Sequence, residues 1–358
     1  MKKNIVVRHP KQLTRHWAQQ VLRHSELDAL VKDVVIESVD PGTTTRIALA
    51  VHHDAGAELP GQWFIKLPSL MLKARLITLI PQLLQKEIYF YNSLQHIAPL
   101  QMPQILAAQT RFGYGSTLVM ANLQAVGQRP GQTSDALSLA QAQAVITELA
   151  KLHVFFYANP ELLKQFAWLS NFNAKAEVEL GSLLALPLMR RGLRLAGELT
   201  PASLHEPALY YAANRQRIMQ MLAATPQTLI HHDCHPGNLF WTEAGPGFLD
   251  WQLVRLGEGV SDVAYFLATA LTVEDRRRYE MELLRLYFDL LAESTNLLSE
   301  QHFYQRYRMH LSYAFEAMIV TLAIGGMMEL ASNLALIQRA SAAVIDHASF
   351  AALGYAKK

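Results

Sequence analysis

Residues 231–252 bring together side chains that could carry out a phosphoryl transfer. In this segment Asp233 is followed five positions later by Asn238 and, twelve positions after that, by Asp250. An aspartate on a loop can accept a proton from a hydroxyl, and Asp and Asn supply the hard oxygen ligands that Mg²⁺ binds. Single Asp and Asn residues are common in turns, but all three at this spacing favour catalysis around a magnesium nucleotide.

Short strands are expected to hold these side chains. Asp233 follows the first of them on a loop, where its carboxylate can face a cleft, and Asp250 ends the third. β-branched and aromatic residues predict these strands. They cover Thr228–His232, Leu239–Thr242 and Phe248–Trp251, with Glu243–Gly247 as a hairpin turn between the last two.

The segment resembles the catalytic loop and metal-binding segment of the aminoglycoside phosphotransferase and choline kinase superfamily, which has the protein-kinase-like fold. In that family the loop reads His-Gly-Asp-x-His-x-x-Asn, and His231, Asp233, His235 and Asn238 are in register with it. The resemblance implies that Asp233 is the catalytic base and that Asn238 and Asp250 bind the metal. His232 departs from the pattern, because the family has glycine there and protein kinases have arginine.

Other landmarks of the family can be matched elsewhere in the chain. Lys66, in Trp-Phe-Ile-Lys-Leu-Pro, lies on a predicted strand, and the resemblance implies that it binds the α- and β-phosphates. Glu87, on the following helix, would pair with Lys66 and fix its position. Asp262 matches an aspartate that caps a helix and steadies the catalytic loop. His153 matches a residue on a helix packed under that loop, and we interpret it as structural.

The phosphate lid is expected in the turn at Asp40–Arg46. This turn contains one glycine, Gly42, where protein kinases have three. The hydroxyls of Thr43 and Thr44, together with backbone amides, can contact phosphate oxygens. The implied cofactors are ATP and Mg²⁺, with GTP left open as the alternative nucleotide.

An adenine-binding hinge is expected at Val119–Leu123. Backbone groups around Met120 and Asn122 would make the adenine contacts. The hinge divides the chain into a nucleotide-binding lobe, residues 1–122, and a lobe with the catalytic loop and the acceptor site, residues 123–358.

Hydrophobic periodicity predicts an α+β fold in two lobes, a small antiparallel-sheet N-lobe and a larger, mostly helical C-lobe. In the N-lobe it predicts helices at residues 11–32 and 75–95 and strands at Val34–Val39, Arg46–His52, Gln62–Leu67 and Ser116–Met120. A turn-rich stretch, Ala125–Gly131, follows. In the C-lobe it predicts helices at Asp135–Tyr157, Pro201–Met221 and Val273–Ala292 and between Glu300 and His347.

Composition restricts the partners and the compartment. A formal charge of +2 is too balanced to favour nucleic acid or an anionic membrane as partner. The single cysteine, Cys234, excludes an internal disulfide, and no signal peptide is visible, so we expect a cytoplasmic protein. The most apolar stretch, Ala317–Met328, is shorter than the ~20 residues that span a bilayer and is interpreted as a buried helix.

The acceptor is expected to be a hydroxyl of a lipophilic small molecule. Phe-Ile-Lys-Leu-Pro and Asp-Trp-Gln are most similar to the ecdysteroid-kinase-like branch of the superfamily, which implies such an acceptor. The insert from Ala174 to Gln220 has four acidic residues against six Lys and Arg, which argues against a polycationic aminoglycoside. Residues that could contact an apolar acceptor are Trp168, Phe172, Tyr210, Tyr211, Phe315 and Met327.

Two other functions fit parts of the sequence. The His and Cys residues at 231–235 suggest a zinc hydrolase, but His231 and His232 are adjacent and would point to opposite sides of an extended chain. A pseudokinase, or a module that binds a ligand without phosphotransfer, is compatible with His232 and with the glycine-poor lid. The complete set of catalytic residues favours an enzyme. The sequence does not indicate the oligomeric state.

Overall fold

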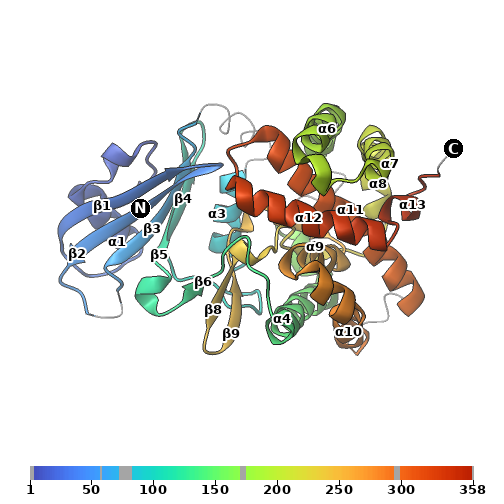
Figure 1. Ribbon diagram of the computed structural model, residues 1–358. Helices are drawn as coiled ribbons and strands as arrows, with labels where there is room; N and C mark the ends of the chain where they lie inside the picture. Colours follow the sequence, from blue (N-terminus) through green and yellow to red (C-terminus); the bar gives the residue numbers. More distant parts are fainter. Residues whose placement is uncertain (1–3, 57–58, 72–82, 170–174, 294–298, 357–358) are drawn as a thin grey trace. The chain divides into compact units, whose positions relative to one another are not determined.

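The computed structural model describes residues 4–56, 59–71, 83–169, 175–293 and 299–356. The chain forms two compact units (Figure 1). The first comprises Met1–Ile97, Gln101–Pro130 and Phe240–Gln252, and the second comprises Ala98–Leu100, Gly131–Leu239 and Leu253–Lys358. These units are defined by how the chain packs and each includes several separate segments. They do not test the predicted boundary between the functional lobes after residue 122, which stays a prediction.

The first unit contains a five-stranded antiparallel sheet in the order β1-β2-β3-β5-β4. Three alternating strands and the strand near residue 118 were predicted and are confirmed. The strands are β1 (Val31–Pro41), β2 (Thr44–His53), β3 (Gln62–Pro68), β4 (Ile105–Arg111) and β5 (Gly115–Ala121). β4 was not predicted, because its Ala-Ala-Gln centre lacks the β-branched residues that identify strands.

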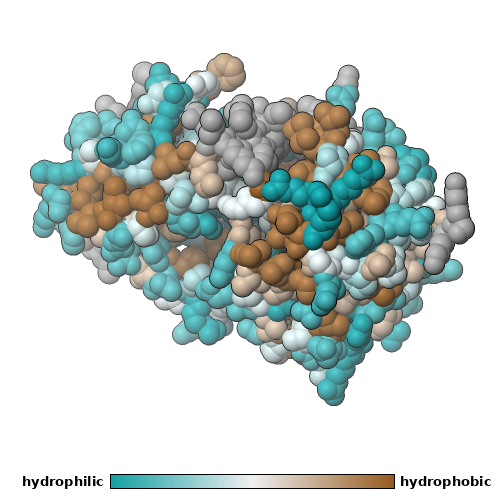
Figure 2. All heavy atoms as spheres, turned by 45° about the horizontal axis from the view of Figure 1, so that its top comes forward, coloured by the Kyte–Doolittle hydropathy of each residue, from teal (hydrophilic) through white to brown (hydrophobic). Residues whose placement is uncertain are grey.

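Helix α1 (Arg15–His24) packs against this sheet and closes a hydrophobic core. Trp17 of α1 and Trp63 of β3 meet edge to face, with ring centroids 6.4 Å apart. The helix ends eight residues earlier than predicted, and β1 begins at Val31. At the sheet edge, β1 leaves Val35 and Val39 exposed. Figure 2 shows hydrophobic residues gathered at the left of the view, on the side that holds the strands.

The first unit also contains α3 (Leu83–Ser93) and a small sheet in the order β6-β8-β9. Residues 75–82 of the helix predicted at 75–95 lie outside the described residues. The strands of the small sheet are β6 (Arg129–Pro130), β8 (Leu239–Thr242) and β9 (Gly245–Phe248).

The strand predicted at Phe248–Trp251 is wrong. β9 starts at Gly245, whose φ of +126° is accessible to glycine, so only two residues separate it from β8. Asp250 has φ +59°, which no strand permits, and Trp251 belongs to a 3₁₀ helix, η5 (Trp251–Leu253). Asp250 therefore lies at a sharp turn after β9.

The second unit is mostly helical, with α11 packed against α6, α9 and α12. Its longer helices are α4 (Leu139–Ala158), α6 (Lys175–Ala196), α7 (Ala202–Ala213), α8 (Arg215–Leu222), α9 (Val260–Ala270), α10 (Val273–Ala292), α11 (Glu300–Ile324) and α12 (Leu330–Asp346). Shorter elements are α5 (Pro160–Lys164), α13 (Ser349–Ala352), and the antiparallel strands β7 (Thr228–Ile230) and β10 (Arg255–Gly257).

Most predicted C-lobe helices are present, and α10 has the predicted bounds. The helix predicted at Pro201–Met221 is interrupted at Asn214, which ends α7 and precedes α8. The helix predicted to reach Met328 stops at Ile324, because Gly325 adopts φ +71°. Among the described helices, none has both the length and the apolar composition needed to cross a bilayer.

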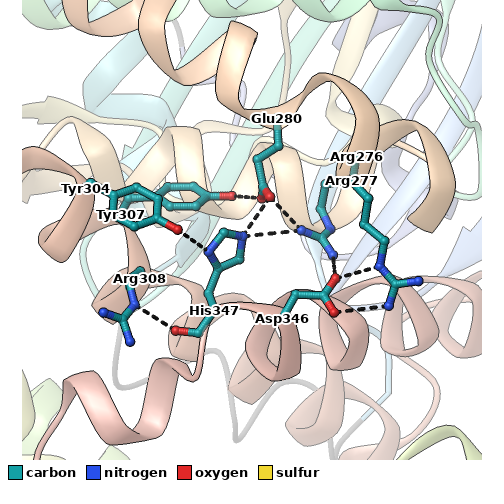
Figure 3. A network of polar contacts seen from close by, with 8 residues as sticks. All are labelled: Arg276, Arg277, Glu280, Tyr304, Tyr307, Arg308, Asp346 and His347. Atoms are coloured by element: carbon teal, nitrogen blue, oxygen red, sulfur yellow. Dashed lines mark hydrogen bonds and ion pairs between the residues drawn. The ribbon is translucent and has the colours of Figure 1, made fainter.

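A polar network joins α10, α11 and the end of α12 (Figure 3). Glu280 accepts hydrogen bonds from Arg276, Tyr307 and His347, and Arg276 also binds Asp346. Burial by itself would raise the pKa of Glu280, but the His347 hydrogen bond and the Arg276 charge lower it below its ordinary value. The network replaces apolar packing at the meeting point of three helices.

Candidate active site

Lys66 is the centre of a charged cluster in the first unit. Its Nζ lies 2.7 Å from Oε1 of Glu87 and 3.2 Å from Oδ2 of Asp250. Lys66 and Glu87 are buried, whereas a third of the Asp250 side chain is exposed. The structure thus forms the expected Lys66–Glu87 pair and adds Asp250 to it.

The charges in this cluster depend on one another. Burial by itself would lower the pKa of Lys66, but the negative charges of Asp250 and Glu87 outweigh it and raise the pKa. Burial raises the pKa of Glu87 to about 7, against the opposing effect of the Lys66 charge. Lys66 is therefore held as a cation with its ammonium directed at two carboxylates.

A strand and a helix carry Lys66 and Glu87, and an aromatic stack anchors the residue after Asp250. Lys66 lies on β3 between Arg46 of β2 and Leu118 of β5. Glu87 projects from α3, and the ring of Trp251 stacks on Phe90 of the same helix, with centroids 4.0 Å apart. This stacking anchors the residue that follows Asp250.

Gln252 was not identified from the sequence. Its Nε2 donates a hydrogen bond to Oε2 of Glu87, at 3.3 Å. Gln252 thus holds the oxygen of Glu87 that does not bind Lys66. Its place two residues after Asp250 was the available signal.

Asp233 and Asn238 lie in the second unit. The Tyr265 hydroxyl donates to Oδ1 of Asp233 at 2.5 Å, and Nδ2 of Asn238 donates to Oδ2 at 3.0 Å. Asn238 Nδ2 also donates to the Asp233 carbonyl oxygen, at 2.8 Å. Both carboxylate oxygens of Asp233 are therefore oriented by donors.

Tyr265 is a contact that the sequence prediction missed. It lies on α9, one turn after Asp262, so both residues face the same side of the helix. Burial and the nearby Asp233 charge hold the pKa of Tyr265 well above its ordinary value. The hydroxyl therefore stays protonated and donates to the carboxylate.

Asp262 anchors the loop that carries Asp233. One of its carboxylate oxygens accepts the backbone N–H of His231 and the other that of His232, both at 2.7 Å. Buried His153 lies with Nε2 3.3 Å from Asp262 and Nδ1 2.8 Å from the Tyr287 hydroxyl. The predicted support of the loop is confirmed. The predicted helix cap is wrong, because Asp262 lies inside α9 and Gly259 is its N-cap.

His232 replaces the family glycine in a backbone conformation that suits glycine. Its φ is +70°, which costs an L-residue roughly 1–2 kcal/mol. The buried imidazole stacks on Tyr313 of α11, with centroids 4.0 Å apart and ring planes inclined by 14°. Burial, followed by the charge of Arg255, holds the pKa of His232 well below its ordinary value. A neutral ring packed on tyrosine offsets part of the strain.

The expected lid forms the turn between β1 and β2. The Gly42 N–H donates to the Thr44 carbonyl at 3.0 Å, and the Ser69 hydroxyl donates to the Gly42 carbonyl at 2.6 Å. Thr43 is half-buried, and Thr44 begins β2 as a buried residue. The turn is thus held by its own backbone and by Ser69.

The expected hinge follows β5. Met120 is buried within the sheet, and the Asn122 N–H donates to the Gln62 carbonyl. Within the described ranges, the Asn122 carbonyl and the Leu123 N–H make no hydrogen bond. One acceptor and one donor of adjacent residues are therefore available to a ligand.

The donor set fits magnesium better than zinc. Asn238 donates two side-chain hydrogen bonds through Nδ2, and across the described part of the chain its amide oxygen accepts none. This leaves a hard oxygen of Asn238 available to a cation. The described residues contain no group of three His, Cys, Asp or Glu side chains that could hold a metal.

The residues considered for an apolar acceptor differ in burial. Tyr211 and Phe315 pack on Phe350 in the core, and the Tyr211 hydroxyl binds Glu316. Trp168, Tyr210 and Met327 are half-buried. Phe172 lies outside the described residues.

A model of the phosphotransferase enzyme family matches residues 74–296, more than half of the chain. The chain belongs to this phosphotransferase family. The match includes Asp233, Asn238 and Asp250 and confirms the resemblance to the superfamily. A search of curated proteins found no match.

Solved structures of kinases share the fold of this phosphotransferase-family chain. An aminoglycoside 2'-phosphotransferase-IIIa in complex with GDP is 15% identical, with 91% of this chain and 98% of that chain covered and a TM-score of 0.51. The ethanolamine kinase of Plasmodium vivax is 14% identical, with 94% and 89% covered and a TM-score of 0.51. A choline kinase of Cryptosporidium parvum is 12% identical, with 90% and 89% covered and a TM-score of 0.51.

These likenesses confirm the predicted fold class, a small antiparallel-sheet part and a larger helical part of the kinase type. Family and fold together support a small-molecule phosphotransferase. The ecdysteroid-kinase-like branch stays a prediction.

Proposed function

We propose that the protein transfers the γ-phosphate of ATP to a hydroxyl of a small, rather apolar acceptor. The observation that carries the proposal is Lys66, a buried cation 2.7 Å from Glu87 and 3.2 Å from Asp250. A lysine fixed by a carboxylate on a neighbouring helix is the arrangement that kinases use to bind the α- and β-phosphates.

Asp233 serves as the base in this proposal. Its carboxylate accepts the proton of the acceptor hydroxyl, while Tyr265 and Asn238 hold the two oxygens in place. Tyr265 and Asn238 thus orient the carboxylate through uncharged donors. Asp233 therefore orients the hydroxyl for attack and removes its proton.

Asn238 and Asp250 would hold Mg²⁺. Bound there, the ion would neutralise the negative charge of the phosphate oxygens. The support is chemical: each residue offers a hard oxygen, and that of Asn238 accepts no hydrogen bond in the described part of the chain. Asp250 is also bound to Lys66, which reduces the cost of its charge.

The nucleotide would be held by backbone groups as well as by Lys66. Gly42, Thr43 and Thr44 would contact phosphate oxygens through amides and hydroxyls. Backbone groups near Met120 and Asn122 would bind adenine, and this is supported by the free Asn122 carbonyl and Leu123 N–H in the described hinge. GTP remains the alternative, and a cytoplasmic location stays a prediction.

An apolar acceptor is supported by the charges of the insert and by the aromatic rings near Asp233. Four acidic residues against six basic ones between Ala174 and Gln220 do not suit a polycation. Near Asp233, the aromatic rings of Tyr265 and Tyr313 lie 5.8 Å apart, and His232 is neutral. A lipophilic alcohol fits these features.

Calorimetric titration of ATP, with and without Mg²⁺, tests the nucleotide site before any acceptor is known. We expect magnesium-dependent binding that Asp250→Ala weakens, whereas Asp233→Asn binds ATP normally and fails to turn over an acceptor found by screening. Asp289→Asn, an exposed change on α10, serves as the control.

Equal loss of ATP binding in both site variants would contradict the separate roles of Asp233 and Asp250. Absence of ATP and GTP binding would favour the alternative of a non-catalytic relative. Magnesium-dependent binding without turnover of any screened alcohol would favour the pseudokinase.

A further inference from the structure

One face of α6 combines exposed leucines with exposed arginines. Leu183, Leu184 and Leu195 are 75%, 41% and 53% exposed, and Arg190, Arg191 and Arg194 are exposed as well. At 3.6 residues per turn, these six residues fall within an arc of roughly 140° on the helix surface. We call these six residues the α6 face.

The opposite side of α6 packs against the rest of the second unit. Gly192 lies so close to α11 that a Cβ there would come within 2.4 Å of Ile319. Ala185, Met189 and Leu193 are buried on the same side. The α6 face therefore points away from α11. In Figure 1, α6 lies at the upper edge of the helical unit, and Figure 2 turns this edge toward the viewer.

The arginines of the α6 face have no acidic partner in the described part of the chain. No hydrogen bond or ion pair there joins Arg190, Arg191 or Arg194 to a carboxylate. The nearest acidic residues in the described sequence are Glu179 and Glu198, one on each side of the six. The face is thus locally basic in a chain whose total charge is only +2.

We propose that the α6 face binds the surface of an anionic lipid bilayer. A helix that carries leucines beside arginines suits the boundary between headgroups and acyl chains: the leucines enter the apolar layer and the guanidinium groups bind lipid phosphates. A soluble acidic partner would bind the arginines but would leave the leucines without an apolar contact. The contact is peripheral and requires no membrane-spanning helix, and it does not depend on the proposed phosphotransfer.

Co-sedimentation of the full chain with vesicles tests the proposal. We expect binding to vesicles of phosphatidylcholine mixed with phosphatidylglycerol, little binding to phosphatidylcholine alone, and weakening with added salt. Reversing three charges in Arg190→Glu, Arg191→Glu, Arg194→Glu should lower the affinity on the order of 100-fold. Leu183→Ser with Leu195→Ser should also weaken binding, at low and at high salt.

Arg278→Glu on α10 is the matched control, because Arg278 is an exposed arginine on another helix. It should bind anionic vesicles nearly as well as the unchanged chain, and thermal unfolding checks that every variant is folded. Equal loss of binding in the control, or equal binding to both kinds of vesicle, would overturn the proposal. The proposal would also fail if the serine variant bound vesicles as well as the unchanged chain and soluble polyglutamate bound equally tightly, since charge alone would then account for the binding.

Discussion

Lys66 and Glu87 form a buried ion pair that joins β3 to α3 within the first unit, with 2.7 Å between Nζ and Oε1. Removing two charges from water costs several kcal/mol per ion, so a pair of this kind adds little net stability. We infer that its value lies in fixing the position of the lysine ammonium.

Replacing Glu87 by glutamine therefore tests how the Lys66 ammonium is positioned, more than it tests the stability of the fold. Glu87→Gln keeps the size of the side chain and removes its charge, so Lys66 loses its main partner. We expect ATP affinity to fall about tenfold, equivalent to ~1.4 kcal/mol. Calorimetric titration measures this, and an unchanged affinity would show that Asp250 alone can position Lys66.

Gln252→Glu should destabilise the protein. The new carboxylate would lie beside Oε2 of Glu87, where the amide of Gln252 now donates a hydrogen bond. Like charges in a buried position lead us to expect a loss of about 1–3 kcal/mol in unfolding free energy. Gln252→Leu removes the same hydrogen bond without adding a charge and should cost less. Equal losses in urea unfolding would rule out charge repulsion as the cause.

Asp262→Asn should loosen the loop that carries Asp233. The carboxylate accepts two backbone N–H groups, and hydrogen bonds to a charged group contribute about 1.5–3 kcal/mol each. Asparagine keeps one acceptor oxygen, so we expect a loss of about 3 kcal/mol in urea unfolding. Ser261→Ala, at the neighbouring buried position, should change little, because the serine hydroxyl has no hydrogen-bond partner in the described residues.

His232 allows a comparison of backbone strain with ring packing. His232→Ala keeps the strained φ of +70° and loses the contact with Tyr313, whereas His232→Gly loses the ring but relieves the strain. We expect the glycine variant to be about 1 kcal/mol more stable than the alanine variant. Thermal unfolding of the two proteins measures the difference. An alanine variant that unfolds at the higher temperature would contradict the left-handed conformation.

The network around Glu280 makes stability depend on pH. Because the folded pKa of Glu280 lies below its ordinary 4.5, the group stabilises the fold above pH 4.5, and this contribution is lost as the pH falls through the folded pKa. The unfolding free energy should therefore fall more steeply below pH 4.5 in the unchanged protein than in Glu280→Gln. Parallel curves from urea unfolding at several pH values would contradict this expectation.

The sequence predicted the parts of the fold that depend on local pattern. Alternating residues identified β2 and β3, and the bounds of α10 follow from its capping Thr272 and its periodicity. β4 was missed because its place depends on pairing with β5, a contact that its own residues do not encode. The strand predicted at Phe248–Trp251 instead forms as β9 at Gly245–Phe248, and this displacement depends on the positive φ of Gly245.

The site was predictable where a motif carried it. Asp233, Asn238 and Asp250 were identified by residue type and spacing. Lys66 and Glu87 were identified by resemblance, and the contact between them is present. Tyr265 and Gln252 were missed, since their contacts require the folding of distant segments onto the motif. Chemical type and spacing alone do not reveal such neighbours.

The anchoring of residues 231 and 232 by Asp262 has an evolutionary consequence. Asp262 binds their backbone N–H groups, which every amino acid except proline carries. Substitutions at both positions can therefore keep these two hydrogen bonds, although a change at His231 loses the bond that its Nδ1 accepts from the Asp233 N–H. This tolerance explains how a histidine could take the place of a glycine one residue before the proposed base while the base keeps its hydrogen bonds.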